Sequence, residues 1–175
     1  MYPGTWARTS PDKPALVMAG SGRTLTYAEL DDRSLRLANR LRAAGLRPGD
    51  VVALLSDNTP ETYEVYWAAL RSGLYITAVN HTLSPDEASY IVRDCDARAL
   101  VVSAAKADLV TRLEVDVEER LAYGGPVEGY GDYEAASLFC TSVSLLLNAP
   151  MPAVATTTTA RTTHLDTRPV NRPAI

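Results

Sequence analysis

The most constraining feature of the sequence is a regular alternation between short apolar runs and longer segments with helical periodicity. The apolar runs occupy residues 51–55, 74–79 and 99–102, and none of them alternates with polar residues. A continuous apolar run is typical of a strand that is buried on both faces. Strands that alternate with helices favour βαβ units, which predicts an α/β fold with a mostly parallel sheet and right-handed crossovers.

Capping signals mark the ends of the predicted helices. The Ser/Thr-x-x-Glu pattern of a capping box occurs at residues 26–29 and again at residues 84–87. A Thr-Pro pair at residues 59–60 suits the N-cap and first helical position of another helix, which lies between the two helices that begin at these boxes. Gly45 and Gly73 follow the first two helices, where a residue with positive φ commonly ends a helix. A further helix is predicted over the residues from Lys106 to Leu113.

A glycine-rich turn separates two short apolar segments near the N-terminus. Gly20, Ser21 and Gly22 lie between them, and this pattern predicts an antiparallel hairpin. The same glycines match the first half of a dinucleotide-binding fingerprint. Leu25 stands where that fingerprint needs its third glycine, and a strand follows instead of a helix. We therefore interpret the glycines as a hairpin turn and not as a nucleotide site.

Composition and charge narrow the range of partners. A hydrophobic content of 46% and a charged content of 22% are typical of a globular protein. A net charge of −4 argues against binding to nucleic acid or anionic lipid. Residues 135–160 carry no charge, but Asn148, Pro150 and Pro152 interrupt them, so a membrane span is not expected. The two cysteines are far apart and no secretory signal is recognisable, which predicts a reduced, cytoplasmic location.

Few residues suggest chemistry on their own. His81 follows a predicted strand, where binding residues gather in open α/β sheets. It has no second histidine, cysteine or nucleophile nearby, so we interpret it as a loop histidine that shapes a turn. Asp94, Cys95 and Asp96 suggest a metal site or a tuned thiol. Neighbouring carboxylates raise the pKa of a thiol and do not activate it, which favours a buried cysteine at a helix end.

Three further groups of residues receive a structural interpretation. The acidic run alternates with apolar residues, which indicates a strand edge or a solvated face; it consists of Glu114, Asp116, Glu118 and Glu119. An aromatic group on one predicted helix is expected in the core; it consists of Tyr63, Tyr66 and Trp67. His164 and Asp166 lie close in sequence, but no nucleophile stands in a defined turn beside them. No catalytic, cofactor-binding or metal-binding residue is therefore assigned.

Several sequence segments, taken in order, resemble segments of a known protein family. Residues 24–55, "TLTYAELDDRSLRLANRLRAAGLRPGDVVALL", and residues 58–103, from "NTPETYEVYWAALRSG" to "DARALVVS", resemble the N-terminal subdomain of the adenylate-forming (AMP-binding) enzymes. That superfamily includes acyl-CoA synthetases, luciferases and adenylation domains. The resemblance covers residues 5–136, including the weaker "LAYGGPVEGYGDYEAA". The segment "LYITAVNHTLSPDEASYIV" is most similar to the fatty acyl-CoA synthetases, which are also called fatty-acid–CoA ligases.

The resemblance implies both a fold and a reaction. The fold would be part of the N-terminal subdomain, with flanking helices and an N-terminal hairpin. Intact members adenylate a carboxylate with ATP and Mg²⁺, release pyrophosphate and transfer the acyl group to coenzyme A. Their triphosphate is held by a loop similar to "SSGTTGRPKG", and a C-terminal subdomain supplies a catalytic lysine. This sequence contains neither, so ATP, Mg²⁺ and coenzyme A are not expected to bind to it.

The resemblance stops abruptly after residue 136. The later segment "ATTTTARTTHL", residues 155–165, shares threonines with the family loop but has no glycine and no lysine. Consecutive β-branched residues do not readily adopt the positive-φ turns that aim several amides at one phosphate. We therefore predict a partial AMP-binding domain over residues 1–136 and a disordered, low-complexity tail over residues 137–175. A reading-frame shift or truncation near residue 136 would explain the change.

Three functional hypotheses follow from the sequence. The first is a fragment of an ATP-dependent acyl-CoA synthetase that is inactive alone and of poor stability because it exposes apolar surface. The second is a non-catalytic binding module. The third is one half of a split synthetase whose other half is encoded separately. The expected partners are the missing subdomains or a second copy of the chain, each bound through exposed apolar surface.

Overall fold

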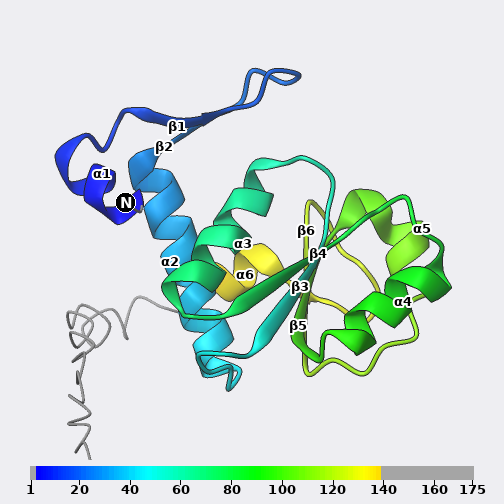
Figure 1. Cartoon of the computed structure of the whole chain (residues 1–175). Helices are drawn as coiled ribbons and strands as arrows, with labels where there is room; N and C mark the ends of the chain where they lie inside the picture. The colour runs from blue at the N-terminus through cyan, green and yellow to red at the C-terminus, as the bar shows by residue number, and fades with distance from the viewer. Residues whose placement is uncertain (1–2, 139–175) are drawn as a thin grey trace, which may run out of the picture.

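The computed structural model describes residues 3–138, and its main feature is a five-stranded parallel sheet with the strand order β4-β3-β5-β6-β7 (Figure 1). The strands of this sheet are β3 (Val51–Leu55), β4 (Tyr75–Val79), β5 (Ala97–Ser103), β6 (Glu119–Tyr123) and β7 (Gly131–Asp132). A separate antiparallel ribbon consists of β1 (Pro14–Val17) and β2 (Thr24–Thr26). The predicted α/β fold with a parallel sheet and an N-terminal hairpin is confirmed.

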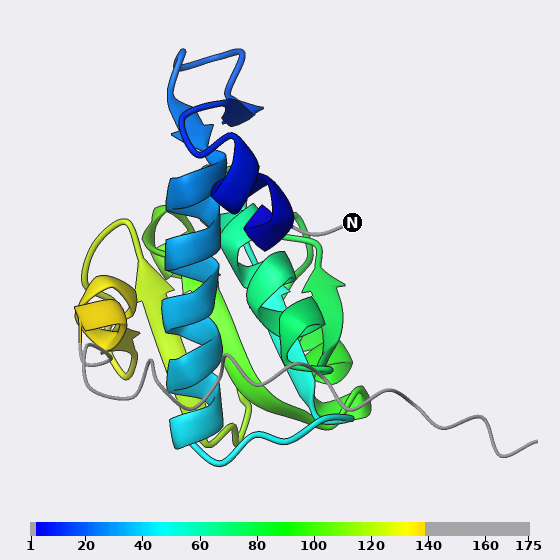
Figure 2. The same cartoon turned by 90° about the vertical axis from the view of Figure 1, so that its left-hand side faces the viewer.

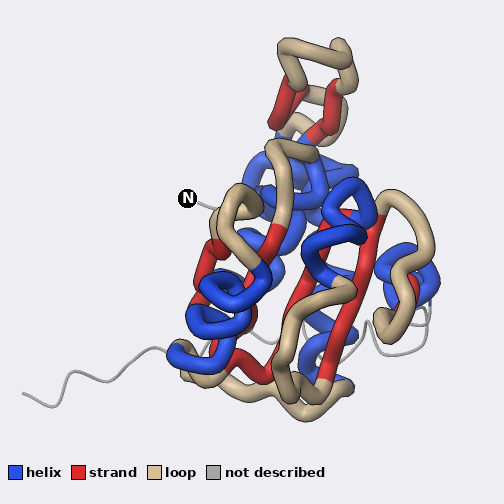
Figure 3. The backbone as a smooth tube through the Cα atoms, turned by 90° about the vertical axis from the view of Figure 1, so that its right-hand side faces the viewer, coloured by secondary structure: helices blue, strands red, loops and turns tan. Residues whose placement is uncertain are grey.

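Helices cover both faces of the main sheet. They are α1 (Pro3–Thr9), α2 (Tyr27–Ala43), α3 (Pro60–Arg71), α4 (Pro85–Asp94), α5 (Ala107–Val110) and α6 (Tyr133–Leu138), with a 3₁₀ turn, η1, at Ala104–Lys106. Figure 2 shows the face that carries α2, α3 and α6, and Figure 3 shows the opposite face with α4 and α5. The covering of both faces explains why the central strands are apolar throughout.

Alternate residues of each strand supply two separate cores. In β3, Val52 and Leu54 point into the core beneath α2 and α3, which also contains Leu41. Ala53 and Leu55 point into the core beneath α4 and α5. This division follows from the two-residue repeat of a strand, because successive side chains lie on opposite sides of the sheet.

The helix ends confirm the local sequence signals. Thr26 caps α2 and Ser84 caps α4, and each forms the complete capping box with the glutamate three residues later. Gly45 and Gly73 have φ values of 96° and 68°, in the region that favours glycine. At Gly73 an added Cβ would also lie 3.2 Å from the Cβ of Pro48, so this turn needs a glycine for two reasons.

Two details of the prediction are wrong. β4 is the edge strand of the described sheet, and Tyr75 is 68% exposed, so this apolar run is not buried on both faces. The helix expected over residues 106–113 is shorter, because η1 precedes α5 and α5 ends at Val110. Thr59 and Pro60 open α3 as its N-cap and first residue, as predicted; the Thr59 hydroxyl donates to the Tyr123 hydroxyl at 3.0 Å and makes no cap hydrogen bond.

The C-terminal predictions lie outside the described residues, except for the first two positions of the predicted tail. They include Cys140, His164, Asp166 and the threonine-rich segment at residues 155–165. Among the described residues, no helix has the combination of length and apolar character that a membrane crossing requires.

Candidate functional site

The carboxyl ends of the parallel strands are where a ligand site is expected in this fold. In open α/β sheets, ligands bind where the connections from two neighbouring strands leave toward opposite faces. β3 and β5 are such neighbours, because β3 leads into α3 on one face whereas β5 leads into η1 and α5 on the other. Ser56 directly follows β3 at this position.

Ser56 belongs to a cluster of hydroxyl groups at this end of the sheet. Its Oγ lies 2.9 Å from the Thr62 Oγ1 and also forms a short hydrogen bond with the hydroxyl of Tyr123. The Thr59 hydroxyl donates to the same Tyr123 oxygen at 3.0 Å. The Asp57 Oδ1 is buried and has no hydrogen-bond partner among residues 3–138. The cluster can donate and accept hydrogen bonds, but it pairs no nucleophile with a general base.

A buried carboxylate lies behind this cluster. Glu64 on α3 is 0% exposed; the Tyr133 hydroxyl donates to its Oε2 at 2.9 Å, and the Arg33 guanidinium lies 3.4 Å from its Oε1. Burial raises the pKa of Glu64, against the opposing effects of Arg33 and the Tyr133 hydroxyl. The Tyr133 ring meets the Tyr123 ring edge-on, with centroids 5.8 Å apart. Glu64 thus ties α2, α3 and α6 together from inside the core, which is a structural role.

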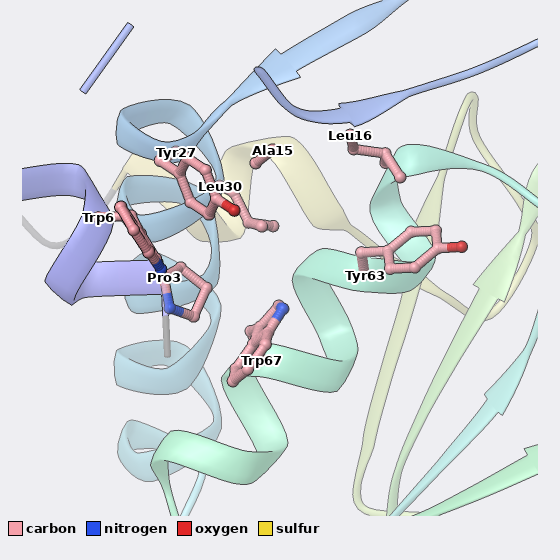
Figure 4. A pocket seen from close by; sticks show the side chains of 8 residues that line it. All are labelled: Pro3, Trp6, Ala15, Leu16, Tyr27, Leu30, Tyr63 and Trp67. Carbon is pink, nitrogen blue, oxygen red and sulfur yellow. The ribbon is translucent and has the colours of Figure 1, made fainter. Parts of the chain in front are cut away.

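An apolar hollow lies near the N-terminus. Figure 4 shows this groove, which has a volume of about 290 Å³. Its walls come from α1, β1, α2 and α3, and it is lined by Pro3, Trp6, Ala15, Leu16, Tyr27, Leu30, Tyr63 and Trp67. The rings of Trp6 and Tyr27 lie 5.9 Å apart, and the Lys13 ammonium lies 5.1 Å from the Trp6 ring centroid. We name this hollow the aromatic groove.

The histidine singled out in the sequence lies in the turn between β4 and α4. His81 is half-buried there, but the hydrogen bonds of the turn come from its neighbours. The Asn80 side-chain oxygen accepts from the backbone amide of Thr82 at 2.9 Å and from the Thr82 hydroxyl at 2.9 Å. Asn80 is therefore the residue that builds this turn.

The cysteine site is a helix end, as predicted. Cys95 follows α4 as its C-cap, is half-buried against the core beneath α4, and donates from its Sγ to the Val92 carbonyl at 3.5 Å. Asp94 and Asp96 are exposed, and Asp96 has a φ of 51° where the chain turns into β5. Among residues 3–138, no group of three or more His, Cys, Asp or Glu residues could hold a metal ion.

The acidic run makes ion pairs where it enters β6. Glu118 pairs with Arg98 at 2.7 Å, and Glu119 pairs with Arg40 of α2 at 2.9 Å. The glycine-rich turn is a hairpin turn, as predicted, with a φ of 70° at Gly22. The aromatic group does not share one environment: Tyr66 packs against the core, whereas Tyr63 is 44% exposed in the wall of the aromatic groove.

Sequence reasoning missed Glu64 and the hydroxyl cluster. A signal for Glu64 was present, since Val65, Ala68 and Ala69 mark the inner face of α3 and the helical repeat places Glu61 and Glu64 on that same face. The hydroxyl cluster had no comparable signal. Ser56 and Tyr123 are 67 positions apart in the sequence, and only the order of the strands brings them together.

Comparison with known proteins adds the family context. The model of the family described as AMP-binding enzyme matches residues 4–157. A fatty acid–[acyl-carrier-protein] ligase of Streptomyces coeruleorubidus is 33% identical over 132 residues, which is 75% of this chain and 25% of the ligase. A feruloyl-CoA synthase of an Amycolatopsis species is 40% identical over 114 residues, which is 63% of this chain and 23% of the synthase. The chain spans about a quarter of the length of these relatives.

Solved structures agree with these sequence matches. An anthranilate–CoA ligase in complex with anthranoyl-AMP superposes with a TM-score of 0.66 and 26% identity, over 78% of this chain and 27% of the ligase. A luciferase-like enzyme of the mealworm Zophobas morio gives a TM-score of 0.70 at 19% identity, over 79% of this chain and 33% of that enzyme. At that identity the second match shows the fold alone.

Proposed function

Because the chain belongs to the AMP-binding enzyme family, we propose that it is the N-terminal part of an ATP-dependent ligase that joins carboxylates to coenzyme A. The observation that carries this proposal is the family match over residues 4–157, together with a length of about a quarter of the relatives. Residues 1–136 would form the partial domain, and residues 137–175 a tail that does no chemistry. A cytoplasmic location, where ATP and coenzyme A are supplied, belongs to the same proposal.

In this proposal the 175 residues alone do not adenylate a carboxylate. A triphosphate needs a loop whose glycines let backbone amides approach it, together with a positive side chain for its outer phosphates. Residues 155–165 have neither glycine nor lysine. The hydroxyl cluster has no basic residue either, so it supplies no replacement. ATP, Mg²⁺ and coenzyme A would bind to other parts of an intact ligase.

Exchange of pyrophosphate into ATP tests the inactivity of the chain. The purified 175-residue protein is incubated with ATP, Mg²⁺, labelled pyrophosphate and a panel of fatty acids, ferulate and hydroxybenzoates. We expect no exchange above the enzyme-free blank. The intact Amycolatopsis feruloyl-CoA synthase serves as the positive control with ferulate. Acid-dependent exchange by the pure chain would refute the proposed inactivity.

A graft tests the positive half of the proposal. Residues 1–136 replace the matching N-terminal quarter of the Amycolatopsis feruloyl-CoA synthase, and exchange is measured with ferulate. We expect the graft to be active, and the synthase without its first quarter to be inactive. A folded graft without activity would show that this segment does not serve as the N-terminal part of such a ligase.

Uncovered apolar surface supports the split synthetase as the second candidate. The aromatic groove is open, and Tyr63 in its wall is 44% exposed. A split synthetase gains exchange activity when a separate polypeptide carrying the later part of the ligase is added to the chain. A binding module gains no activity from that addition, so one measurement separates the two alternatives.

A further inference from the structure

The ribbon of β1 and β2 is fixed to the rest of the molecule at the end that joins α2. The Tyr27 amide at the start of α2 donates to the Lys13 carbonyl at 3.0 Å. In the same turn the Ala28 amide donates to the Pro11 carbonyl at 3.1 Å. Leu25, the residue before the α2 cap, is 3% exposed. Backbone hydrogen bonds and apolar burial therefore hold the base of the ribbon.

The other end of the ribbon extends away from the main sheet (Figure 1). Residues 19–22 form the turn at this free end, and all four are exposed. A Cβ added to Gly20 or Gly22 would meet no atom within 4 Å beyond its chain neighbours, so no other element closes around the turn. A two-stranded ribbon is marginally stable in water by itself. The free end therefore keeps a fixed position only if something ties it to the body of the molecule.

One ion pair provides this tie. The Arg23 guanidinium, just before β2, lies 2.8 Å from the Oε1 of Glu61 in the first turn of α3. The Glu61 side chain is only 10% exposed, and among residues 3–138 Arg23 is its one ion-pair partner. A carboxylate that is this deeply buried is costly to leave without a positive partner. Loss of Arg23 should therefore have a larger effect than loss of a partner in an exposed ion pair.

The same ion pair connects two walls of the aromatic groove. Leu16 of β1 lines one wall, and Tyr63 of α3 lines another (Figure 4). Arg23 belongs to the ribbon and Glu61 to α3, so their pairing holds these two walls together from outside the groove. The contacts inside the groove do not include a second ion pair between the ribbon and α3 among the described residues.

We propose that the ribbon is a strap along the aromatic groove, and that the Arg23–Glu61 ion pair is the clasp that holds its free end. With the clasp formed, Leu16 stays beside the α3 wall. With the clasp broken, the ribbon pivots on its fixed base and the groove widens. Because the Arg23 side chain is 44% exposed, salt screens the pair, and ionic strength therefore controls the closed fraction. The strap consists of described residues alone and holds whether or not the chain serves as part of a ligase.

Amide hydrogen exchange of the 175-residue chain, followed by NMR, tests the clasp. The Met18 amide is the reporter, because it donates to the Arg23 carbonyl at 2.9 Å near the free end of the ribbon and is exposed when a released ribbon frays. We expect Arg23→Gln to raise the exchange rate of this amide at least fivefold and to leave the amides of α2 unchanged. Arg36→Gln is the matched control, because Arg36 forms an exposed pair with Asp32 at 2.8 Å within α2. The control should stay within twofold of the unsubstituted chain.

Salt and a conservative variant separate a clasp from a general loss of structure. Raising NaCl from about 0.05 M to about 1 M should speed exchange of the Met18 amide at least threefold in the unsubstituted chain, because screening weakens the pair. The same change should have little effect in Arg23→Gln, which has no pair to screen. Arg23→Lys keeps the positive charge and should retain at least half of the protection that Arg23→Gln loses.

Tryptophan fluorescence reports on the groove itself. Trp6 and Trp67 are the two tryptophans of the chain, so a Trp6→Phe background leaves Trp67, which is half-buried in the groove wall. In that background we expect Arg23→Gln to raise the quenching of Trp67 by acrylamide by at least half. Faster exchange at Met18 without a change in this quenching would overturn the widening of the groove.

The remaining outcomes decide the clasp. An unchanged Met18 exchange rate in Arg23→Gln, or the same salt response with and without Arg23, would overturn it. A rise in exchange that is uniform over the ribbon, α2 and the main sheet would show general destabilisation and would overturn it as well. Faster exchange confined to the ribbon, together with retention of protection in Arg23→Lys, would support it.

Discussion

Removing a single oxygen atom, with Tyr133→Phe, should destabilise the chain more than most surface substitutions do. The Tyr133 hydroxyl donates to the Glu64 Oε2 at 2.9 Å, and both side chains are buried. The substitution keeps the aromatic ring and its edge-on contact with Tyr123. The change therefore isolates the hydrogen bond, because it opens no large cavity in the core.

The size of the effect follows from the charge of the acceptor. A hydrogen bond to a charged group contributes about 1.5–3 kcal/mol, against about 1 kcal/mol for a neutral pair. Without the Tyr133 hydroxyl, the Glu64 carboxylate keeps the more distant Arg33 guanidinium, at 3.4 Å, as its other recorded partner. We expect Tyr133→Phe to lower the free energy of unfolding by about 2 kcal/mol. That is a large part of the stability of a small domain.

Urea unfolding of the 175-residue protein at pH 8, followed by circular dichroism, measures this loss. Tyr130→Phe is the matched control, because the Tyr130 hydroxyl donates to a neutral acceptor, the Val110 carbonyl, at 3.3 Å. The control should cost about 1 kcal/mol or less. Equal losses for the two variants, or a loss below about 0.5 kcal/mol for Tyr133→Phe, would refute the assigned role of Glu64.

Three further predictions concern single positions. Because burial raises the pKa of Glu64 above its ordinary value of 4.5, the folded chain holds this proton more tightly than the unfolded chain. The resulting stabilisation is complete below pH 4.5 and is lost as the pH rises through the raised pKa; Glu64→Gln should remove a slope of up to about 1.4 kcal/mol per pH unit from urea unfolding measured between pH 4 and 8. Gly73→Ala should cost about 1–2 kcal/mol in the same assay because of its positive φ, whereas Gly20→Ala, with open space around the added methyl group, should be nearly neutral. Ser84→Ala should cost about 1 kcal/mol through loss of the α4 cap, and an unchanged unfolding midpoint would contradict that role.

The parallel α/β fold could be predicted because its signals are local. A capping box depends on residues three positions apart, and both predicted boxes, at Thr26 and Ser84, are present. The apolar runs at residues 51–55 and 99–102 became central strands, since only strands covered on both faces need to be apolar throughout. These features depend on nearby sequence and not on the order of the strands.

Strand order was not predictable from the same signals. The run at residues 74–79 resembles the other two, yet β4 is the edge of the described sheet and leaves Tyr75 exposed. Whether an apolar strand is central depends on which distant segment pairs with its second edge. No residue near β4 carries that information.

Glu64 shows why the buried network was harder to predict than the fold. A glutamate in a helix usually lies on a solvated face, and its partner Tyr133 is 69 positions away. Within residues 3–138 the inner side of α3 is fully satisfied, because Glu64 has its hydrogen bonds and Val65 is buried. The outer side carries Tyr63, which is 44% exposed, and the half-buried Trp67, and both side chains line the aromatic groove. Tyr63 therefore gains only part of the hydrophobic stabilisation that full burial would give, so α3 satisfies its inner side more fully than its outer side.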